Sequence, residues 1–498
     1  MLRSFVFIST NSSLAKLTPE QQEVVKCDFE DVLLVNAYAG TGKTSTLVQF
    51  CKARSEYNIL YLSYNSSMRK EAEEKFKELK NISVKTMHSL AYETLEMSDY
   101  KSRLGNLRAL NITHLFNDLN ADYKNMYANT ALKLIRKFCN SSFNMEGFIK
   151  DFYSNPKDYS LNDNMRKYMK TFIKELWNEI KTNAEFAYEH DFYLKEYQLS
   201  KPKLDYDFIL VDEAQDINPC VIDIVLNQQH TKKVFIGDTY QSIYKFRGAE
   251  NSLNFLSKKE NSKTLYLTQS FRCPQAISNI ANNYLKLLNA PRDFKGTLKT
   301  QQINTNQKTI IARTNAILFD FAIENIDKKM YFVGGIDSYS FDELLDIQHI
   351  VFKKFDFIKN KFYLNFQDLK ELSSYATEAE EIDLKQKINI LFKYIQSDII
   401  SLIKKIKSQS VKKESQADLI LTTGHKSKGL EWDNVEILDD FINIREKLLE
   451  SENFELQREE IHLFYVALTR TKGKLSMNED FIIKDNEVKV IQERLEIK

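Results

Sequence analysis

Short apolar runs, separated by segments with helical spacing, recur along this chain of 498 residues. The runs are rich in Val, Ile, Leu, Phe and Tyr, and their alternation with helical segments is typical of a doubly wound parallel sheet. Six runs predict strands of a first sheet, and three more predict a second sheet. They lie at residues 32–36, 59–63, 82–86, 206–211, 233–237 and 264–268, and at 308–312, 418–423 and 434–438.

Two long stretches interrupt this strand pattern. Residues 91–200 have helical spacing and almost no strand signal, which predicts an α-helical insertion in the first α/β unit. Residues 317–415 interrupt the second unit, and their pattern leaves their character open. This second stretch ends in a basic run that favours a solvated helix face over a nucleic-acid contact. Its lysines are Lys404, Lys405, Lys407, Lys412 and Lys413.

Length and composition narrow the class of protein. The length predicts two to four domains, and 12 Gly and 6 Pro indicate long helices with few flexible linkers. The net charge is +1, so any nucleic-acid contact has to come from a local groove. Five scattered cysteines, with no CxxC pair or Cys/His cluster, argue against a disulfide framework and a zinc site.

The sequence contains no apolar span of 18 residues, and its first residues carry too short an apolar run for a signal peptide. We therefore expect a soluble protein without membrane contact. Its expected location is the cytoplasm for a bacterial or phage-like protein and the nucleus for a eukaryotic one.

The residues that carry chemistry begin with LVNAYAGTGKTSTL, residues 34–47. An apolar strand runs into a glycine-containing loop, and a helix then opens with Lys43 and Thr44. Backbone N–H groups of such a loop hold phosphates, the lysine reaches the β- and γ-phosphates, and the hydroxyl can hold Mg²⁺. Ala37 stands where the strict motif has glycine.

A second buried run, FILVDEAQD at residues 208–216, ends in Asp212 and Glu213. These carboxylates would lie at the carboxyl edge of the sheet, where α/β proteins present groups to a ligand. The two segments together predict hydrolysis of a nucleoside triphosphate.

Seven further segments resemble, in order and spacing, motifs of the UvrD/Rep group of superfamily 1A DNA helicases, with a particular likeness to the motor part of F-box DNA helicases. The resemblance covers most of residues 17–475, apart from the two insertions. The segments are LTPEQQ (17–22), YLSYNSSM (61–68), KTMHSLAY (85–92), IGDTYQSIYKFRGA (236–249), LTQSFRCPQAI (267–277), LTTGHKSKGLEWDNVEI (421–437) and FYVALTRTKGKL (464–475).

The resemblance implies ATP and Mg²⁺ as cofactors. The implied catalytic residues are Lys43, Asp212, Glu213, Gln241 at the γ-phosphate, and the arginine fingers Arg272 and Arg470. The implied Mg²⁺ ligands are Thr44 and Asp212. Phe271 replaces the tyrosine that usually packs on adenine. The remaining nucleotide-binding residues are Gln21, Ala39, Gly40, Thr41, Gly42, Ser45 and Glu431.

The same resemblance implies a path for single-stranded DNA. Phe246 stands where the family places an aromatic ring that stacks on a base, which contributes ~1–3 kcal/mol per base. The other implied DNA contacts are Asn65, Thr86, His88, Arg247, His425 and Lys428.

The implied architecture is α/β, with two RecA-like P-loop domains of parallel sheet, each carrying an inserted accessory domain. Expected boundaries are 1–90 with 201–265 for the first RecA-like domain and its ATP site, and 91–200 for its helical insertion. The second RecA-like domain is expected at 266–316 with 416–498, and its small insertion at 317–415. Only about 16 residues precede the first motif, so we expect no F-box segment there.

The resemblance implies a helicase or translocase that moves 3′→5′ on single-stranded DNA, in repair, recombination or genome defence. Expected partners are single-stranded DNA, junctions of single- and double-stranded DNA, and a repair factor or nuclease. An alternative is a nucleic-acid-sensing ATPase subunit whose main output is control of such a protein partner. Dependence of strand separation on that partner would discriminate between the two.

Overall fold

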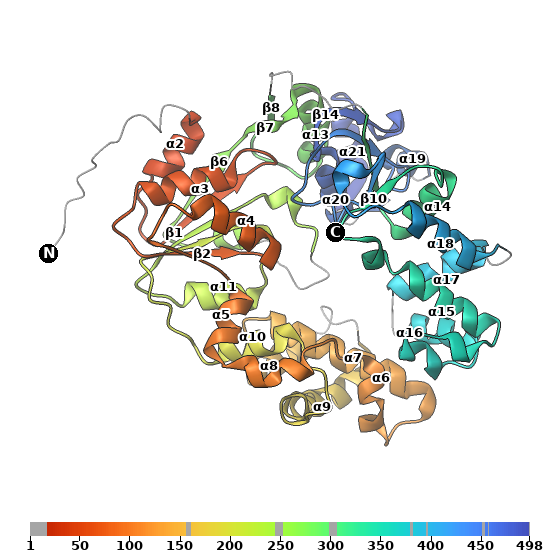
Figure 1. Ribbon diagram of the computed structural model, residues 1–498. Coiled ribbons are helices and arrows are strands. Elements are labelled where there is room, and N and C mark those ends of the chain that lie inside the picture. The colour runs from red at the N-terminus through yellow and green to blue at the C-terminus, as the bar shows by residue number, and fades with distance from the viewer. Residues whose placement is uncertain are drawn as a thin grey trace.

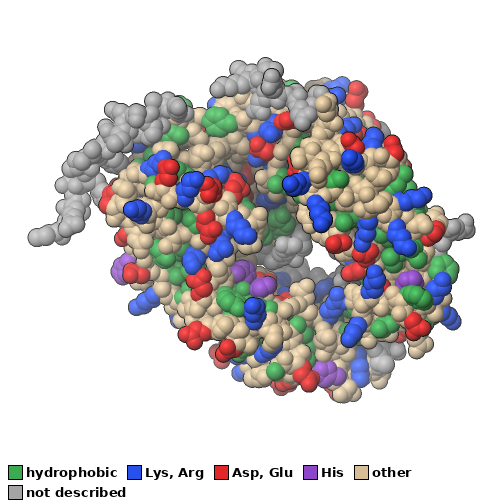
Figure 2. Space-filling model, viewed as in Figure 1, with side chains coloured by type: hydrophobic (Ala, Val, Ile, Leu, Met, Phe, Trp, Pro, Cys, Tyr) green, Lys and Arg blue, Asp and Glu red, His purple; other side chains and the backbone are tan. Residues whose placement is uncertain are grey.

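The computed structural model describes residues 17–155, 161–244, 252–297, 306–378, 382–394, 397–450, 454–456 and 458–497. Four groups of elements lie around a central hollow, which is visible in the space-filling view (Figures 1 and 2). Two groups are built on parallel sheets and two are helical. No helix in these described ranges has the length and apolarity needed to cross a membrane.

The first sheet has six parallel strands in the order β3-β2-β4-β5-β1-β6. Alternate residues of the interior strand β1 enter different cores: Leu33 and Val35 pack on one face, and Val32 and Leu34 on the other. Burial on both faces explains why the interior strands are largely apolar, whereas the edge strands β3 and β6 are only partly buried. The strands are β1 (Val32–Ala37), β2 (Ile59–Ser63), β3 (Ile82–Thr86), β4 (Phe208–Val211), β5 (Lys232–Gly237) and β6 (Ser262–Leu267).

Helices cover both faces of this sheet (Figure 1). On one face Val24, Phe50 and Phe76 bring α2 (Pro19–Lys26), α3 (Lys43–Lys52) and α4 (Ser66–Phe76) onto the strands. The other face is covered by α5 (Met87–Thr94), α10 (His190–Leu199), α11 (Pro219–Leu226) and α12 (Ser252–Leu256).

The first insertion is helical, as predicted. Its helix α9 (Asp163–Thr182) buries Met165, Met169, Ile173, Leu176 and Trp177, which recur every three or four residues along one face. The other helices of this group are α6 (Ala109–Ile112), α7 (Ala121–Asn140) and α8 (Met145–Ser154).

The second sheet has five parallel strands in the order β10-β11-β9-β12-β14. Its predicted strands correspond to β9 (Lys308–Ala312), β11 (Leu419–Thr423) and β12 (Trp432–Ile437). The edge strands β10 (Met330–Phe332) and β14 (Thr471–Ser476) were not predicted. β10 falls inside the range predicted for the second insertion, so a strand of the sheet comes from that range.

One face of the second sheet packs on α13 (Gln275–Leu287), α20 (Arg458–Leu468) and α21 (Val488–Arg494). Two short parallel pairs flank this group, and α19 (Ile444–Glu450) packs beside it. The pairs are β7 (Gln269–Pro274) with β8 (Lys295–Thr297), and β13 (Phe454–Leu456) with β15 (Leu495–Ile497). The mixed α/β fold with two parallel sheets confirms the predicted fold class, while the domain boundaries stay a prediction.

The second insertion is also helical, and it shares its core with the other face of the second sheet. It meets the first insertion where α16 approaches α7, and the Arg108 guanidinium lies 4.7 Å from the centre of the Phe362 ring. The helices are α14 (Asn315–Glu324), α15 (Phe341–Val351), α16 (Leu369–Glu378), α17 (Ile382–Tyr394) and α18 (Ile399–Gln409).

Candidate active site

The loop between β1 and α3 has the shape expected of a phosphate-binding loop. Gly40 and Gly42 adopt left-handed backbone conformations, with φ of 69° and 79°. A side chain on Gly40 would place its Cβ 2.5 Å from the Cβ of Arg272, so only glycine fits between the loop and β7. The N-terminus of α3 then points its unsatisfied N–H groups toward the site, which favours an anion.

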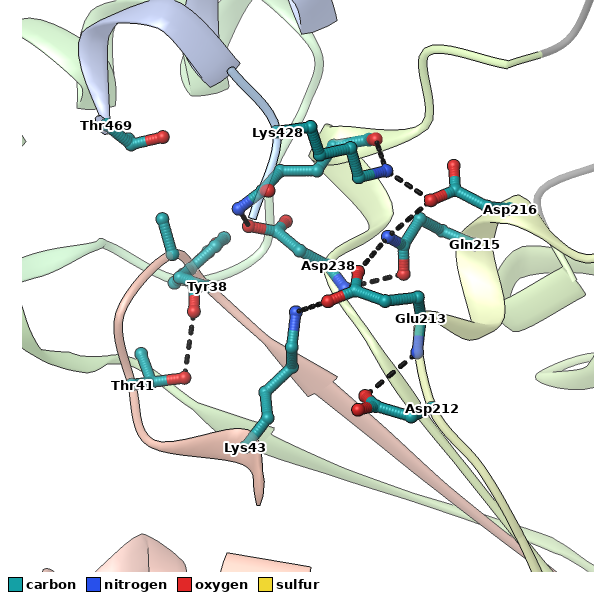
Figure 3. Close-up of polar contacts among 12 residues, drawn as sticks. Tyr38, Thr41, Lys43, Asp212, Glu213, Gln215, Asp216, Asp238, Lys428 and Thr469 are labelled. Atoms are coloured by element: carbon teal, nitrogen blue, oxygen red, sulfur yellow. Dashed lines mark hydrogen bonds and ion pairs between the residues drawn. The ribbon is translucent and has the colours of Figure 1, made fainter. Parts of the chain in front are cut away.

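The carboxylates that follow β4 face this loop (Figure 3). The Nζ of Lys43 lies 2.8 Å from Oε1 of Glu213. Burial opposes the charge on Lys43, but the nearby Glu213 and Asp212 outweigh it and raise the lysine pKa. Burial likewise opposes ionisation of Glu213, but Lys43 and Lys428 lower the pKa of this carboxyl to about 2. Glu213 is therefore an anion at neutral pH, held in a left-handed conformation with φ of 50°.

Asp212 is held by two donors. Its Oδ1 accepts a hydrogen bond from the backbone N–H of Glu213 at 2.9 Å, and its Oδ2 accepts one from the hydroxyl of Tyr61 on β2. Burial and the neighbouring Glu213 raise the pKa of Asp212. Asp212 and Thr44 line the same cleft. A carboxylate and a hydroxyl facing a phosphate loop are a donor set that suits Mg²⁺, which uses few protein ligands and keeps several waters.

A buried amide network joins the loop after β5 to these carboxylates. Gln241 donates from Nε2 to Oδ2 of Asp238 at 2.8 Å. Gln215 accepts from the N–H of Asp238 at 3.0 Å and donates to Glu213 at 2.6 Å. Consecutive hydrogen bonds therefore connect Gln241 with Glu213.

The two predicted arginine fingers come from elements packed with the second sheet, and one of them, Arg470, contacts this network. Arg470, at the end of α20, is only 1% exposed and donates to Oε1 of Gln241 at 3.3 Å. Burial and the nearby Arg272 lower its pKa to about 10, so it remains a cation at neutral pH. Arg272, on β7, donates from Nε to Glu431 at 2.6 Å. Glu431 is therefore paired with Arg272.

The predicted adenine end of the site lies beside the loop. The Phe271 ring is 50% exposed and would be 3.6 Å from a Cβ placed on Gly42. Gln21 is buried, and its Nε2 donates to the carbonyl of Thr41 at 3.1 Å while its Oε1 accepts from Thr18 N–H. The Nε2 end of the Gln21 amide thus ties α2 to the loop, while its Oε1 end caps the N-terminus of α2 itself.

These residues enclose a cleft of about 470 Å³. Of the predicted nucleotide and catalytic residues, all but Gln21 and Ala39 line it. Those lining it are Gly40, Thr41, Gly42, Lys43, Thr44, Ser45, Asp212, Glu213, Gln241, Phe271, Arg272, Glu431 and Arg470. The Ala39 N–H instead points at the hydroxyl of Tyr465, 3.4 Å away.

Aromatic rings of the two sheet groups lie next to one another. Tyr64 and Tyr244 stack with ring centres 5.8 Å apart and planes 11° apart. The ring centre of His425 lies 6.4 Å from that of Tyr244. The Tyr244 hydroxyl donates to the His425 carbonyl at 3.3 Å, which joins the two sheet groups. Stacked rings of this kind suit the bases of a single strand.

The other predicted DNA contacts have structural partners. Asn65 and Thr86 cap the N-termini of α4 and α5. The Nε2 of His88 lies 3.1 Å from Oδ1 of Asp191. Lys428, predicted to contact the DNA backbone, is buried in an ion pair with Asp216 and donates to the Gln241 carbonyl at 2.5 Å. Phe246 and Arg247 lie outside the described residues.

Five residues of this network were not predicted: Tyr61, Gln215, Asp216, Asp238 and Tyr465. Tyr465 is fully buried and donates to Asp238 at 3.1 Å from the other sheet group. Asp216 and Asp238 stand inside segments that had been singled out, so their acidic side chains beside apolar strands were an available signal. Tyr61 and Tyr465 lie in apolar runs, where the sequence pattern predicts that a tyrosine belongs to the hydrophobic core.

Comparison with known proteins agrees with the geometry. Residues 17–263 match the family model of the UvrD/REP helicase N-terminal domain. F-box DNA helicase 1 of Gallus gallus is 29% identical over 95% of this chain and 50% of its own length. F-box DNA helicase protein 1 of Schizosaccharomyces pombe is 28% identical over 93% of this chain and 57% of its own.

ATP-dependent DNA helicase PcrA of Staphylococcus aureus is 26% identical over 76% of this chain and 56% of its own length. The chain therefore spans about half the length of the curated relatives it matches.

Proposed function

We propose that this chain, which carries a UvrD/REP-type helicase domain over residues 17–263 and resembles F-box DNA helicases over most of its length, is an ATP-dependent DNA helicase or translocase. One observation carries the proposal. Arg272 and Arg470 approach from elements of the second sheet group and line the same cleft as Lys43 and Glu213 of the first. A site shared by two groups makes hydrolysis depend on their relative position.

The chain's own residues supply the charge that phosphoryl transfer requires, since this reaction is catalysed mainly by positioning and electrostatics. Lys43 would bind the β- and γ-phosphates after leaving its pair with Glu213. Arg272 and Arg470 would stabilise the charge that develops on the γ-phosphate. Arginine fingers of this kind supply about 10³–10⁵ in rate.

Glu213 would orient the attacking water. Its pKa of about 2 makes it a weak base, so orientation is the larger part of its role. Gln241 contacts Arg470 on one side and, through Asp238 and Gln215, Glu213 on the other. Gln241 would therefore move when the γ-phosphate is bound or released, and its contacts would pass that movement to both sheet groups.

Thr44 and Asp212 would hold Mg²⁺, which supplies charge neutralisation at the phosphates when bound. Among the described residues, no group of three or more His, Cys, Asp or Glu side chains is arranged so that it could hold a metal ion by itself. That pattern is compatible with Mg²⁺, because the nucleotide and water provide most of its ligands.

Single-stranded DNA would lie across both sheet groups, against Tyr64, Tyr244 and His425 and beside the central hollow. The resemblance supports 3′→5′ movement. Repair, recombination or genome defence would be the setting, and junctions of single- and double-stranded DNA the substrates.

The test is ATP hydrolysis with and without single-stranded DNA, beside the Lys43→Ala variant. We expect strong stimulation that the variant lacks, and strand-displacement assays with 3′ or 5′ tails would then give the polarity. Hydrolysis that is indifferent to DNA would overturn the motor assignment and favour an ATPase subunit controlled by a protein partner.

A further inference from the structure

The segment that follows α15 exposes large aromatic side chains. Phe352 is 52% exposed and Phe357 is 66% exposed, although both are apolar. The ring of His349 lies 5.7 Å from that of Phe357, with planes 37° apart. We call His349, Phe352, Phe357 and the lysines described below the α15 patch. Exposed aromatic rings that lie five residues apart in one short segment are a candidate interaction site.

The α15 patch is held in one conformation. The N–H of Lys354 donates to the His349 carbonyl at 2.8 Å and the N–H of Lys353 to the Ile350 carbonyl at 3.1 Å, which is a Schellman ending of the helix. Lys353 takes the left-handed position of that motif, with φ of 55°. Asp346, which is buried, accepts from the N–H groups of Lys359 and Asn360. A surface fixed before binding loses little entropy when a ligand arrives.

The α15 patch is also basic. Residues 352–361 contain four lysines against one acidic residue, Asp356, and therefore carry a net charge of +3. Lys354 and Lys359 lie close enough to His349 to help burial lower its pKa, against the opposing effect of Asp346. Figure 2 shows Lys and Arg side chains close to hydrophobic ones over α15, at the right of the molecule. The exposed lysines are Lys353, Lys354, Lys359 and Lys361.

We propose that the α15 patch is a second binding site for single-stranded DNA, in which Phe352 and Phe357 stack on bases and the surrounding lysines contact phosphates. Flat rings interleaved with cations match a polymer that alternates bases and phosphates. An acidic peptide would use the lysines but would leave the rings exposed. The proposal rests on the proposed function, because strand separation supplies a second single strand near the protein.

The position of the patch suits that role. Phe362 directly follows residues 352–361, and its ring packs against the guanidinium of Arg108 in the first insertion. The α15 patch therefore adjoins the place where the two insertions meet, outside the nucleotide cleft. A strand held there would be kept from pairing again with the strand on the Tyr64–Tyr244 path.

The test compares the Phe352→Ala/Phe357→Ala double variant with wild type and with Phe392→Ala. Phe392 is 55% exposed in the same insertion, but the neighbouring Lys393 is paired with Asp320. Fluorescence anisotropy would measure binding of labelled oligodeoxythymidylates of increasing length. ATP hydrolysis stimulated by a short oligonucleotide would report the motor path separately.

We expect the double variant to keep stimulated hydrolysis and short-oligonucleotide affinity, and to lose about 5- to 150-fold in affinity for long oligonucleotides per stacked base. Phe392→Ala should match wild type. Unchanged affinity for long oligonucleotides would overturn the site, and an altered oligomeric state with unchanged affinity would reassign it to a protein contact. Wild type that neither binds DNA nor responds to it would overturn the proposed function and this site with it.

Cross-linking gives a direct second measurement. All five natural cysteines are buried, so a maleimide should label a Phe357→Cys variant at that position. Benzophenone attached there should cross-link to a long oligodeoxythymidylate, whereas the same label on Phe392→Cys should not. Equal cross-linking from both positions would overturn the proposal.

Discussion

Replacing Gly40 by alanine should uncouple the phosphate-binding loop from the strand that carries Arg272. Gly40 has φ of 69°, and a Cβ there would lie 2.5 Å from the Cβ of Arg272 and 2.8 Å from Oγ of Ser270. The Arg272 Cβ is attached to the backbone, so rotation of a side chain cannot relieve the contact. The loop or β7 has to move, which would break the bond of 2.8 Å between the Phe271 N–H and the Gly40 carbonyl.

Two costs add at this position. A left-handed conformation costs a non-glycine residue roughly 1–2 kcal/mol. Forcing an extra methyl group into a packed contact costs a further ~1–3 kcal/mol. We therefore expect Gly40→Ala to lose about 2–5 kcal/mol in total. The cost of the packed contact of ~1–3 kcal/mol distorts the ATP site, and it corresponds to a loss of about 5- to 150-fold in ATP affinity.

Gly334→Ala is the matched control. Gly334 also has a left-handed φ of 79°, but a Cβ there would meet only Oγ of Ser338 at 3.4 Å, an ordinary contact. Calorimetric titration with ATP and unfolding by urea would be measured on both variants. We expect both to lose unfolding free energy and Gly40→Ala alone to lose ATP affinity. Wild-type ATP affinity in Gly40→Ala, with a stability loss equal to that of Gly334→Ala, would refute the argument.

Three further outcomes follow from the same geometry. Lys43→Ala should abolish ATP hydrolysis while circular dichroism shows an intact fold, and wild-type turnover would contradict the site. Burial raises the pKa of Asp216 to about 6 in the folded chain against 3.8 for the free group, so the free energy of unfolding should fall as pH rises from about 4 to about 6. At 1.36 kcal/mol per pKa unit, this decrease in the free energy of unfolding is about 3 kcal/mol. The Asp216→Asn variant, measured by urea unfolding, should not show the decrease. Equal pH dependence of stability in both proteins would refute this. Lys353→Gly should raise the unfolding free energy by up to about 1 kcal/mol, because glycine relieves the left-handed strain, and a loss of stability would count against it.

Most strands that could be predicted from sequence carry a continuous apolar run, and β2, β4 and β11 are buried along their whole length. All nine predicted runs correspond to strands. Strands β10 and β14 were missed for a physical reason: β10 is only three residues long, and β14 reads TKGKLS, with four polar residues. Such edge strands are defined by pairing with β11 and β12 rather than by their own pattern.

Motif spacing placed the nucleotide-binding candidates around one cleft, but it could not show how their charges pair. Lys428 is separated from Asp216 by 212 residues, and Tyr465 from Asp238 by 227. Such contacts depend on how the two sheet groups pack. A lysine that is exposed in an isolated motif is therefore buried here, and a tyrosine that reads as core reaches the loop after β5.

The strand order of the first sheet has a consequence for synthesis on the ribosome. The interior strand β1 pairs with β5 and β6, so the partners of Val32, which are Lys233 and Ser262, leave the ribosome only after about 200 more residues have been made. Closing a loop of about 200 residues carries a large entropic cost before any strand contact repays it. The helices between β3 and β4 pack on one another, as α10 does on α5 and α7, so they can form during that interval. An early stop in translation would thus leave β1 apolar and unpaired, as a substrate for chaperones or a seed for aggregation.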